Sequence, residues 1–224
     1  MVAAVFPDQI FAQLSVGEVP LRVVGYLAWH DGRARVERFI AHRFQEQHQA
    51  KIRAFLPMLV ALESVSGEIY AAIGVRSANA EKLFLEQYLN NPIEAEIARY
   101  SRTECGRKDV IEVGNLAAGQ RGISRYFFAV LTDVLLQWGA RWLACTGTPD
   151  VVNVFHRLGM QPLEIAGANP DCLPDRGSQW GSYYSHNPIV MVGEVARGHA
   201  LIQKSGFLQR CNYRRSEVSD VLIA

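Results

Sequence analysis

Two glutamates in this sequence lie inside runs of large apolar residues. Glu86 lies in residues 83–89, which read LFLEQYL, and Glu112 lies in residues 110–117, which read VIEVGNLA. Burial disfavours the charged form of a carboxyl group and raises its pKa, so that it becomes better suited to accepting a proton near neutral pH. Glu112 and Glu86 are therefore candidate proton acceptors. Glu112 is favoured because its run is expected to be the central strand.

Both glutamates also have a purely structural interpretation. Glu86 can belong to the outward face of a short strand or helix, and Glu112 can pair with a buried arginine such as Arg43 or Arg76. The neighbouring amides of Gln87 and Asn115 either orient a bound molecule or satisfy backbone groups. The residues alone leave these alternatives open.

A short loop with two glycines follows the run at 110–117. It contains Gly119, Gln120, Arg121, Gly122, Ile123 and Ser124, and a helical pattern begins after it. Glycines allow successive backbone N–H groups to face one concavity at the positive end of a helix, where phosphates bind. The loop has no Gly-Lys-Ser/Thr and lacks the third glycine of the dinucleotide fingerprint. It predicts either a phosphate site or a plain strand-to-helix connection.

The elements that must position these residues follow from the apolar pattern. Apolar runs predict strands, spacings of three and four predict helices, and glycine or proline marks their ends. We expect strands at residues 21–28, 57–62, 69–75, 110–117, 141–145, 162–166 and 189–195, and helices at 35–55, from 92 onward, at 127–138 and at 150–158. The first half of the chain contains a predicted hairpin, and in the second half strands alternate with helices. This order predicts an α/β protein with a mixed sheet and helices on both of its faces.

The same pattern predicts one domain that covers residues 20–195. Residues 1–19 show no clear periodicity and are expected to form an N-terminal leader. Residues 196–224 are rich in Lys and Arg and also lack apolar periodicity, so they are expected to form a C-terminal appendage or a partner-binding tail.

Composition excludes several functional classes. The chain has 224 residues, of which 49% are hydrophobic and 20% charged, and its net charge of +1 gives no reason to expect binding to nucleic acid. The four cysteines are scattered without metal-ligand spacing, so we expect free thiols in a reducing compartment and no metal site. No apolar run is long enough for a membrane span, and the first residues lack the pattern of a signal peptide, so we expect a cytoplasmic protein.

The segment from residue 110 to residue 160 resembles the core of the GNAT acyltransferases. It reads as strand, glycine loop, helix, strand and helix, and it ends in VFHRLGM. The chain as a whole resembles the thermostable haemolysin family more closely, across roughly residues 20–195. The matching motifs are FIxxRF at 39–44, FxP at 55–57, GxRxA at 74–78, LFLEQYL at 83–89, IEVGNLA at 111–117 and WGSYY at 180–184.

This resemblance implies a GNAT-like fold and an N-acyltransferase. The acyl group would move from acyl-CoA, or from an acyl-carrier protein, to a small amine or amino acid, without a metal. A looser likeness to the acyl-homoserine-lactone synthases points to a long acyl chain. The name of the family favours an alternative, a membrane-active lytic protein. A GNAT-like domain that binds an acyl donor without catalysis is a third reading.

The resemblance also implies roles for individual residues. Backbone N–H groups near Leu116 and Ala117 would polarise the thioester carbonyl, and residues 119–124 would hold the phosphates of the donor. Glu112 or Glu86 would take the proton of the amine. Asn115 is expected to join these glutamates in the catalytic group. Phe155 is expected to contact the donor, and the residues expected to bind the substrate are Arg43, Gln87, Tyr88 and Tyr183.

Two positions depart from the pattern of the superfamily. Asn115 stands where the acyl-homoserine-lactone synthases have an arginine. Phe155 stands where many acetyltransferases have a tyrosine that protonates the leaving thiolate, and it has no hydroxyl group. The resemblance therefore leaves the source of that proton open.

Overall fold

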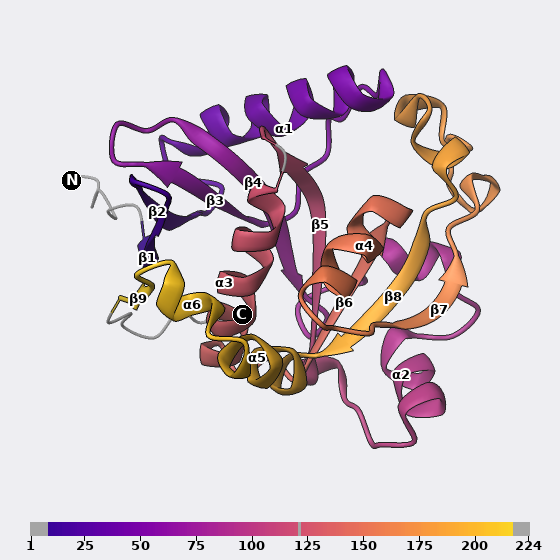
Figure 1. Cartoon of the computed structure of the whole chain (residues 1–224). Coiled ribbons are helices and arrows are strands. Elements are labelled where there is room, and N and C mark those ends of the chain that lie inside the picture. Colours follow the sequence, from indigo (N-terminus) through magenta and orange to yellow (C-terminus); the bar gives the residue numbers. More distant parts are fainter. Residues whose placement is uncertain (1–8, 121, 217–224) are drawn as a thin grey trace, which may run out of the picture.

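The computed structural model describes residues 9–120 and 122–216, and its centre is a nine-stranded mixed sheet (Figure 1). The strand order is β7-β8-β6-β5-β4-β3-β2-β1-β9. The strands are β1 (Gln9–Val16), β2 (Val19–Tyr26), β3 (Met58–Ser64), β4 (Ile69–Ser77), β5 (Val110–Ala118), β6 (Trp142–Gly147), β7 (Leu163–Gly167), β8 (Ile189–Glu194) and β9 (Arg214–Arg215). Neighbouring strands are antiparallel except β5 and β6, which are parallel.

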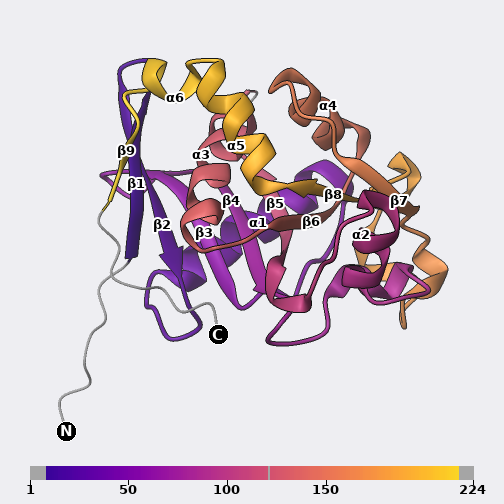
Figure 2. The same cartoon turned by 90° about the horizontal axis from the view of Figure 1, so that it is seen from below.

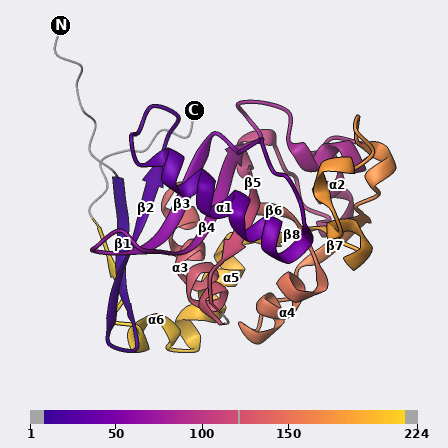
Figure 3. The ribbon, with the colours of Figure 1, turned by 90° about the horizontal axis from the view of Figure 1, so that it is seen from above.

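Helices cover both faces of this sheet. Helix α1 (Arg33–His48) lies on the upper face (Figure 3), and α3 (Ile123–Gln137) and α5 (Val195–Lys204) lie on the lower face (Figure 2). The remaining helices are α2 (Ile93–Ser101), α4 (Pro149–Arg157), α6 (Phe207–Arg210) and the short 3₁₀ helices η1 (Phe84–Tyr88), η2 (Arg107–Asp109), η3 (Pro170–Cys172), η4 (Ser178–Trp180) and η5 (Tyr183–His186). The mixed sheet with helices on both faces is as the sequence predicts.

The strands bury both faces because their side chains alternate between two apolar cores. In β3, Leu59 and Ala61 pack with α1, whereas Met58 and Val60 pack with α3. Every residue of β3 is buried, and this explains its continuous apolar run. The sheet therefore provides a rigid platform under the glycine loop.

Helix α1 ends earlier than the sequence predicts. Its buried residues Val36, Ile40 and Phe44 are spaced by four. The helix stops at Gln49, whose φ of +56° is left-handed and whose N–H donates to the carbonyls of Gln45 and Phe44. The predicted end at residue 55 was wrong because this cap ends the helix before Pro57 does.

The N-terminal leader expected at residues 1–19 is not separate from the sheet. Residues 9–16 form β1, which pairs with β2 along its whole length. Phe11 is buried, and its ring lies edge-on to Trp138 at 4.9 Å between centroids. Gly25 makes room for this ring, because a Cβ there would lie 2.5 Å from Phe11 Cζ. A bulge between Ile10 and Ala12 interrupts the alternation of apolar residues in β1, so the sequence pattern does not indicate a strand there.

The expected C-terminal appendage also belongs to the folded body. Val195, Gly198 and Ile202 form the buried stripe of α5, which packs against α3. The strand β9 then adds to the edge of β1. Arg215 Nη2 binds Asp133 Oδ1 of α3 at 2.6 Å. A glycine occupies one position of the apolar stripe, and a hydropathy pattern therefore does not show the helix clearly.

Candidate active site

The parallel strands β5 and β6 separate after four residues. Their pairing runs from Val110 with Trp142 to Val113 with Cys145, and β6 then continues alone beside β8. On the other side, β5 stays paired with β4, but Gly74 faces Gly114 and Ala72 faces Ala117, so β5 carries a bulge. The bulge bends β5 away from β6 and opens a cleft between the two strands.

Asn115 holds this bulge in place. Its φ of +50° lies in the left-handed region, which asparagine tolerates better than most residues. Its Oδ1 accepts a hydrogen bond from Leu56 N at 2.9 Å, and its Nδ2 donates to Ala54 O at 3.3 Å. Gly74 is required beside it, because a Cβ there would lie 2.7 Å from Asn115 Oδ1. Asn115 therefore shapes the cleft from the strand itself.

The cleft has a volume of about 450 Å³. Residues 113–116 of β5 form its floor, and Thr146 and Gly147 of β6 lie opposite. One side, which we call the donor wall, contains Ser124 of α3 and Val151 and Val154 of α4. The other side, which we call the aromatic wall, contains Phe44, Phe84, Tyr88, Trp180 and Tyr183.

The glycine loop connects β5 to the donor wall. Gly119 N donates to Tyr70 O at 2.8 Å, and Gly122 has a φ of +87°, which favours glycine. Helix α3 begins at Ile123, so its first N–H groups have no partner within the helix. Gln120 is exposed in the turn, and Arg121 lies outside the described residues. The first turn of α3 therefore presents backbone N–H groups beside Ser124, which lines the cleft.

Arg43 supports this loop from above. Its Nε donates to Ala118 O at 2.9 Å, and its Nη1 pairs with the carboxylate of Glu46. Arg43 is absent from the residues that line the cleft and does not pair with Glu112. The geometry therefore gives Arg43 a structural contact with the strand end rather than a position facing a bound substrate.

Glu112 lies at the base of the cleft and is 3% exposed. Its Oε2 and Oε1 accept hydrogen bonds from the backbone N–H groups of Phe84 and Leu85 at 3.0 and 2.8 Å. Arg76 Nε lies 3.9 Å from Oε2. Burial raises the pKa of Glu112, and the two N–H donors and Arg76 oppose that rise without cancelling it. The carboxylate thus ties η1 to the central strand.

Glu86 lies outside the cleft. Its Oε1 accepts from Ile93 N at 3.0 Å and from Arg107 Nη1 at 2.7 Å, and its Oε2 accepts from Leu83 N at 2.8 Å. Burial raises the pKa of Glu86, but the hydrogen bonds from Arg107 and the two backbone groups lower it more, so the net shift is downward. The expectation that Glu86 accepts a proton is therefore wrong, because its oxygens are occupied and it does not reach the cleft.

The aromatic wall collects side chains from three distant segments. Trp180 lies 5.7 Å from Phe84 and 5.3 Å from Tyr183 between ring centroids. Tyr88 and Tyr184 share a hydrogen bond of 2.6 Å between their hydroxyl groups, and the Tyr183 hydroxyl donates to Thr146 O at 3.4 Å. Burial raises the pKa of Tyr183, so this hydroxyl stays protonated. Tyr88 and Tyr183 both line the cleft, and their expected contact with the substrate stays a prediction.

Gln87 does not share that position. Its Nε2 donates to Phe84 O at 3.1 Å, and it lines a separate hollow beside Lys51 and Pro174. The expectation that Gln87 orients a substrate in the cleft is therefore wrong. Its amide satisfies the backbone of η1, which was the structural alternative.

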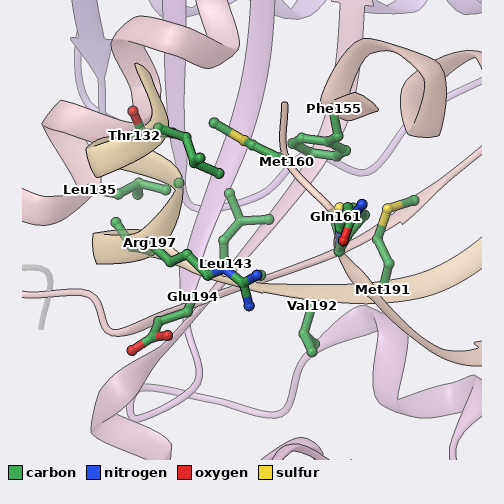
Figure 4. Close-up of a pocket in the computed structure, with 16 residues that line it drawn as sticks. Thr132, Leu135, Leu143, Phe155, Met160, Gln161, Met191, Val192, Glu194 and Arg197 are labelled. Atoms are coloured by element: carbon green, nitrogen blue, oxygen red, sulfur yellow. The ribbon is translucent and has the colours of Figure 1, made fainter. Parts of the chain in front are cut away.

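Phe155 belongs to a second, smaller cavity of about 70 Å³ on the lower face of the sheet (Figure 4). Its ring packs on Phe128 at 4.8 Å between centroids, and the cavity is lined by apolar residues such as Met160 and Met191. Phe155 does not line the cleft between β5 and β6. The geometry therefore contradicts the expectation that Phe155 contacts the donor, because its ring packs on Phe128 and lines the lower cavity, whereas Val151 and Val154 of the same helix line the cleft.

Six polar residues of the cleft were missed at the sequence level, including Gln47 and Thr148 at its edge. The other four are His48, Thr146, Asp150 and His186. His48 lies on the same face of α1 as Phe44, four residues earlier, and this spacing was the available signal. Burial and the neighbouring His186 lower the pKa of His48, and Asp150 opposes this shift. His186 and Thr146 follow no pattern in the sequence, since only the fold brings their segments together.

Two further observations bear on the functional class. In the part of the chain that the structure describes, no helix combines the length and the apolar character needed to cross a membrane. Within the same residues, no three histidine, cysteine, aspartate or glutamate side chains converge as a metal site would require.

A separating pair of parallel strands beside a glycine loop and a helix N-terminus defines a protein of GNAT-like fold. The chain belongs to the thermostable hemolysin family, whose sequence profile matches residues 27–199. A search of curated proteins gave no match.

Solved structures share the fold at low sequence identity. FeeM, an N-acyl amino acid synthase from uncultured soil microbes, is 17% identical with a TM-score of 0.55, and the match covers 90% of this chain and 99% of that one. A putative arylalkylamine N-acetyltransferase 7 from the yellow fever mosquito is 14% identical with a TM-score of 0.54, covering 86% and 98%. BjaI, a CoA-dependent acyl-homoserine lactone synthase, is 8% identical with a TM-score of 0.52, covering 87% and 89%.

Proposed function

We propose that this protein is an N-acyltransferase that moves an acyl group from a thioester, acyl-CoA or acyl-carrier protein, to a small amine or amino acid. The observation that carries this proposal is the opening between β5 and β6 beside the N-terminus of α3. An open strand edge offers backbone N–H groups to a carbonyl oxygen, and a helix N-terminus offers them to a phosphate. A phosphopantetheine thioester carries both groups on one arm.

The donor enters along the donor wall. Its phosphate binds at Gly122, Ile123 and Ser124, where the partial positive charge of α3 is concentrated. Its thioester carbonyl then reaches the strand near Leu116 and Ala117, where backbone N–H groups stabilise the oxyanion of the tetrahedral intermediate. Asn115 contributes by fixing the bulge that exposes this strand edge.

The amine enters against the aromatic wall. Tyr88, Trp180 and Tyr183 give this side an apolar surface with hydroxyl groups at its edge. Glu112 holds η1, and with it Phe84, in position through two backbone hydrogen bonds. Because each of its oxygens accepts a backbone hydrogen bond from η1, Glu112 acts as a positioning residue rather than as the proton acceptor.

A thermal-shift and turnover experiment tests this function. The purified protein is mixed with acyl-CoAs from acetyl to palmitoyl and with acyl-carrier protein, and the melting temperature is measured. A donor at 100 times its Kd adds about 2.7 kcal/mol to the free energy of unfolding. Each stabilising donor is then combined with an amine panel, and mass spectrometry detects the amide. Absence of both stabilisation and amide with every donor would contradict the proposal.

A pair of variants at Ser124 shows whether the donor uses the α3 N-terminus. Ser124→Glu places a negative charge in the first turn, which stabilises a helix by about 0.3–1 kcal/mol but repels a phosphate. Ser124→Gln is the matched neutral control. We expect Ser124→Glu to keep or raise the melting temperature of the free protein and to abolish the shift caused by the donor. Equal donor shifts in the two variants would exclude this phosphate site.

The alternative of direct lysis is separated by a leakage assay. Liposomes that contain a fluorescent dye are mixed with the protein in the absence of any thioester. On the proposed function, dye is released only when donor and amine are both present and an amphiphilic amide accumulates. Leakage caused by the protein alone would favour the membrane-active reading that the family name suggests.

A further inference from the structure

His48 is held rigidly at the edge of the cleft. It is the last residue of α1, and its backbone carbonyl accepts a hydrogen bond of 2.8 Å from Ser182 N. Its imidazole lies 5.3 Å from the rings of both Tyr183 and His186, measured between centroids. The ring is therefore fixed between α1 and η5, and its Nδ1 makes no hydrogen bond to any residue that the structure describes.

Three buried polar groups of the cleft make no hydrogen bond in the described part of the chain, and one of them, Nε of Arg76, lies 3.2 Å from the carboxylate of Glu81. Within the described residues, Nδ1 of His48 and Oγ1 of Thr146 are buried and make no hydrogen bond. Buried polar atoms are nearly always paired with protein, water or a bound molecule. Both residues line the cleft, one from α1 and one from β6. A ligand placed between them would satisfy groups that the folded chain leaves unpaired.

We propose that His48 is the proton acceptor of the acyl transfer and that Thr146 binds the amine beside it. This inference rests on the proposed function and adds to it a residue for the step that Glu112 does not perform. Each oxygen of Glu112 accepts a backbone hydrogen bond from η1, whereas Nδ1 of His48 has no competing hydrogen bond among the described residues. The amine contacts His48 and Thr146 while its substituent lies on the aromatic wall.

The charges around His48 agree with this role. Its own helix brings no ionised partner to it, η5 brings His186 and Tyr183, and α4 brings Asp150. Glu112 and Arg76 line the same cleft and are close to each other, at 3.9 Å. Burial and His186 lower the pKa of His48 against the opposing effect of Asp150, so the imidazole is neutral at neutral pH and can accept a proton.

During the proposed acyl transfer the nitrogen of the acceptor loses two protons. The ammonium group of the acceptor gives one proton to His48 and becomes a free amine, whose nitrogen lone pair attacks the thioester carbonyl carbon. A C–N bond forms, the carbonyl becomes an oxyanion at the β5 strand edge, and the C–S bond breaks as the oxyanion collapses. The second proton lost from nitrogen goes to the leaving thiolate. His48 then releases its proton to solvent, and the products are an amide and a free thiol.

A comparison of two nucleophiles distinguishes a role of His48 as proton acceptor from a purely structural role. Phenethylamine is protonated at neutral pH and needs a base, whereas hydroxylamine is largely unprotonated and does not. Thiol release is followed with a chromogenic disulfide for wild type, His48→Gln and His42→Gln, with decanoyl-CoA and decanoyl-carrier protein as donors. His42 is the matched control, because it lies on the same helix and is exposed to solvent.

We expect His48→Gln to lower kcat/KM for phenethylamine about 100-fold and for hydroxylamine less than about 10-fold, while His42→Gln matches wild type. Thr146→Val should raise KM for phenethylamine about 5-fold with little change in kcat, since it removes one hydrogen bond. If His48→Gln lowers kcat/KM equally for both nucleophiles, His48 is not the proton acceptor, and the proposed acyl transfer itself is not contradicted. No thiol release by wild type with either nucleophile would overturn the proposed function itself.

Discussion

Asn115 of β5 and Leu56, which precedes β3, are joined by a hydrogen bond of 2.9 Å from the Leu56 N–H to the Asn115 side-chain oxygen. This bond crosses from the central strand to a segment 59 residues earlier in the chain. It fixes the bulge that separates β5 from β6, and it occupies the amide that the sequence suggested for substrate binding. The shape of the cleft therefore depends on a side chain whose polar atoms are bonded to the backbone of residues 54 and 56, which also line the cleft.

Replacing Asn115 should reveal this dependence. Asn115→Ala loses both side-chain hydrogen bonds and keeps a left-handed φ, so we expect a loss of about 2–4 kcal/mol in the free energy of unfolding. Asn115→Gly loses the same bonds but adopts that φ without strain, so its loss should be smaller by about 1 kcal/mol. Urea unfolding measures both values. Equal stability of the two variants would show that backbone strain at this position is unimportant.

Glu112→Gln should weaken the attachment of η1. The amide can accept only one of the two backbone hydrogen bonds, because its NH₂ group faces a donor, and we expect a loss of about 1–3 kcal/mol. Glu104→Gln, at an exposed position, is the control and should be neutral. Since Glu112 is not the proton acceptor, the midpoint of the pH–rate profile should stay unchanged in Glu112→Gln. If one limb of the pH–rate profile is shifted or absent in Glu112→Gln, Glu112 is the proton acceptor.

The ionised carboxylate of Asp133 should make the free energy of unfolding decrease at acidic pH. Burial raises its pKa, but the hydrogen bonds from Arg215 and Tyr213 and the charge of His199 lower it more, so its folded pKa lies below the unfolded value. Its contribution is complete above the unfolded pKa of about 3.9 and is lost as pH falls through the folded pKa. We expect Asp133→Asn to melt at lower temperature than wild type at pH 7 and to lose that difference below about pH 3. A constant difference across this range would contradict the ion pair.

Phe155→Tyr tests the position at which the superfamily supplies a hydroxyl group. In this fold the new hydroxyl would enter an apolar region beside Phe128 and not the cleft. We expect a loss of about 1–3 kcal/mol in stability and no gain in the rate of acyl transfer. Differential scanning calorimetry and the thiol-release assay check the two effects. A faster reaction would place residue 155 near the leaving thiolate after all.

The sequence predicted the fold better than the site. Strong apolar runs, such as that of β3, and glycine or proline boundaries gave the central strands and helices, because burial determines both pattern and structure. The terminal elements were missed where the pattern is irregular. In β1 a bulge interrupts the alternation, and in α5 Gly198 occupies a buried position. These segments are held by pairing and by the Asp133–Arg215 ion pair, which are long-range contacts.

The site was predicted only where its residues are contiguous. Residues 112–116 of β5, which are contiguous in the sequence, all line the cleft, and the sequence indicated this strand directly. His48 and Thr146 meet across the fold from segments 98 residues apart, so no local spacing reveals them. Glu86 and Glu112 look alike in sequence, yet the arrangement of hydrogen-bond donors around each differs. Such differences in partners depend on tertiary structure.

The two walls of the cleft have separate origins in the chain, and this separation has an evolutionary consequence. The donor wall comes from α3 and α4, whereas the aromatic wall is assembled from the end of α1, η1 and the segment that contains Trp180 and Tyr183. Substitutions in one wall therefore need not disturb the other. On the proposed function, members of this family can diverge in the amine they accept while inheriting the same handling of the thioester, so acceptor choice is free to vary between close relatives.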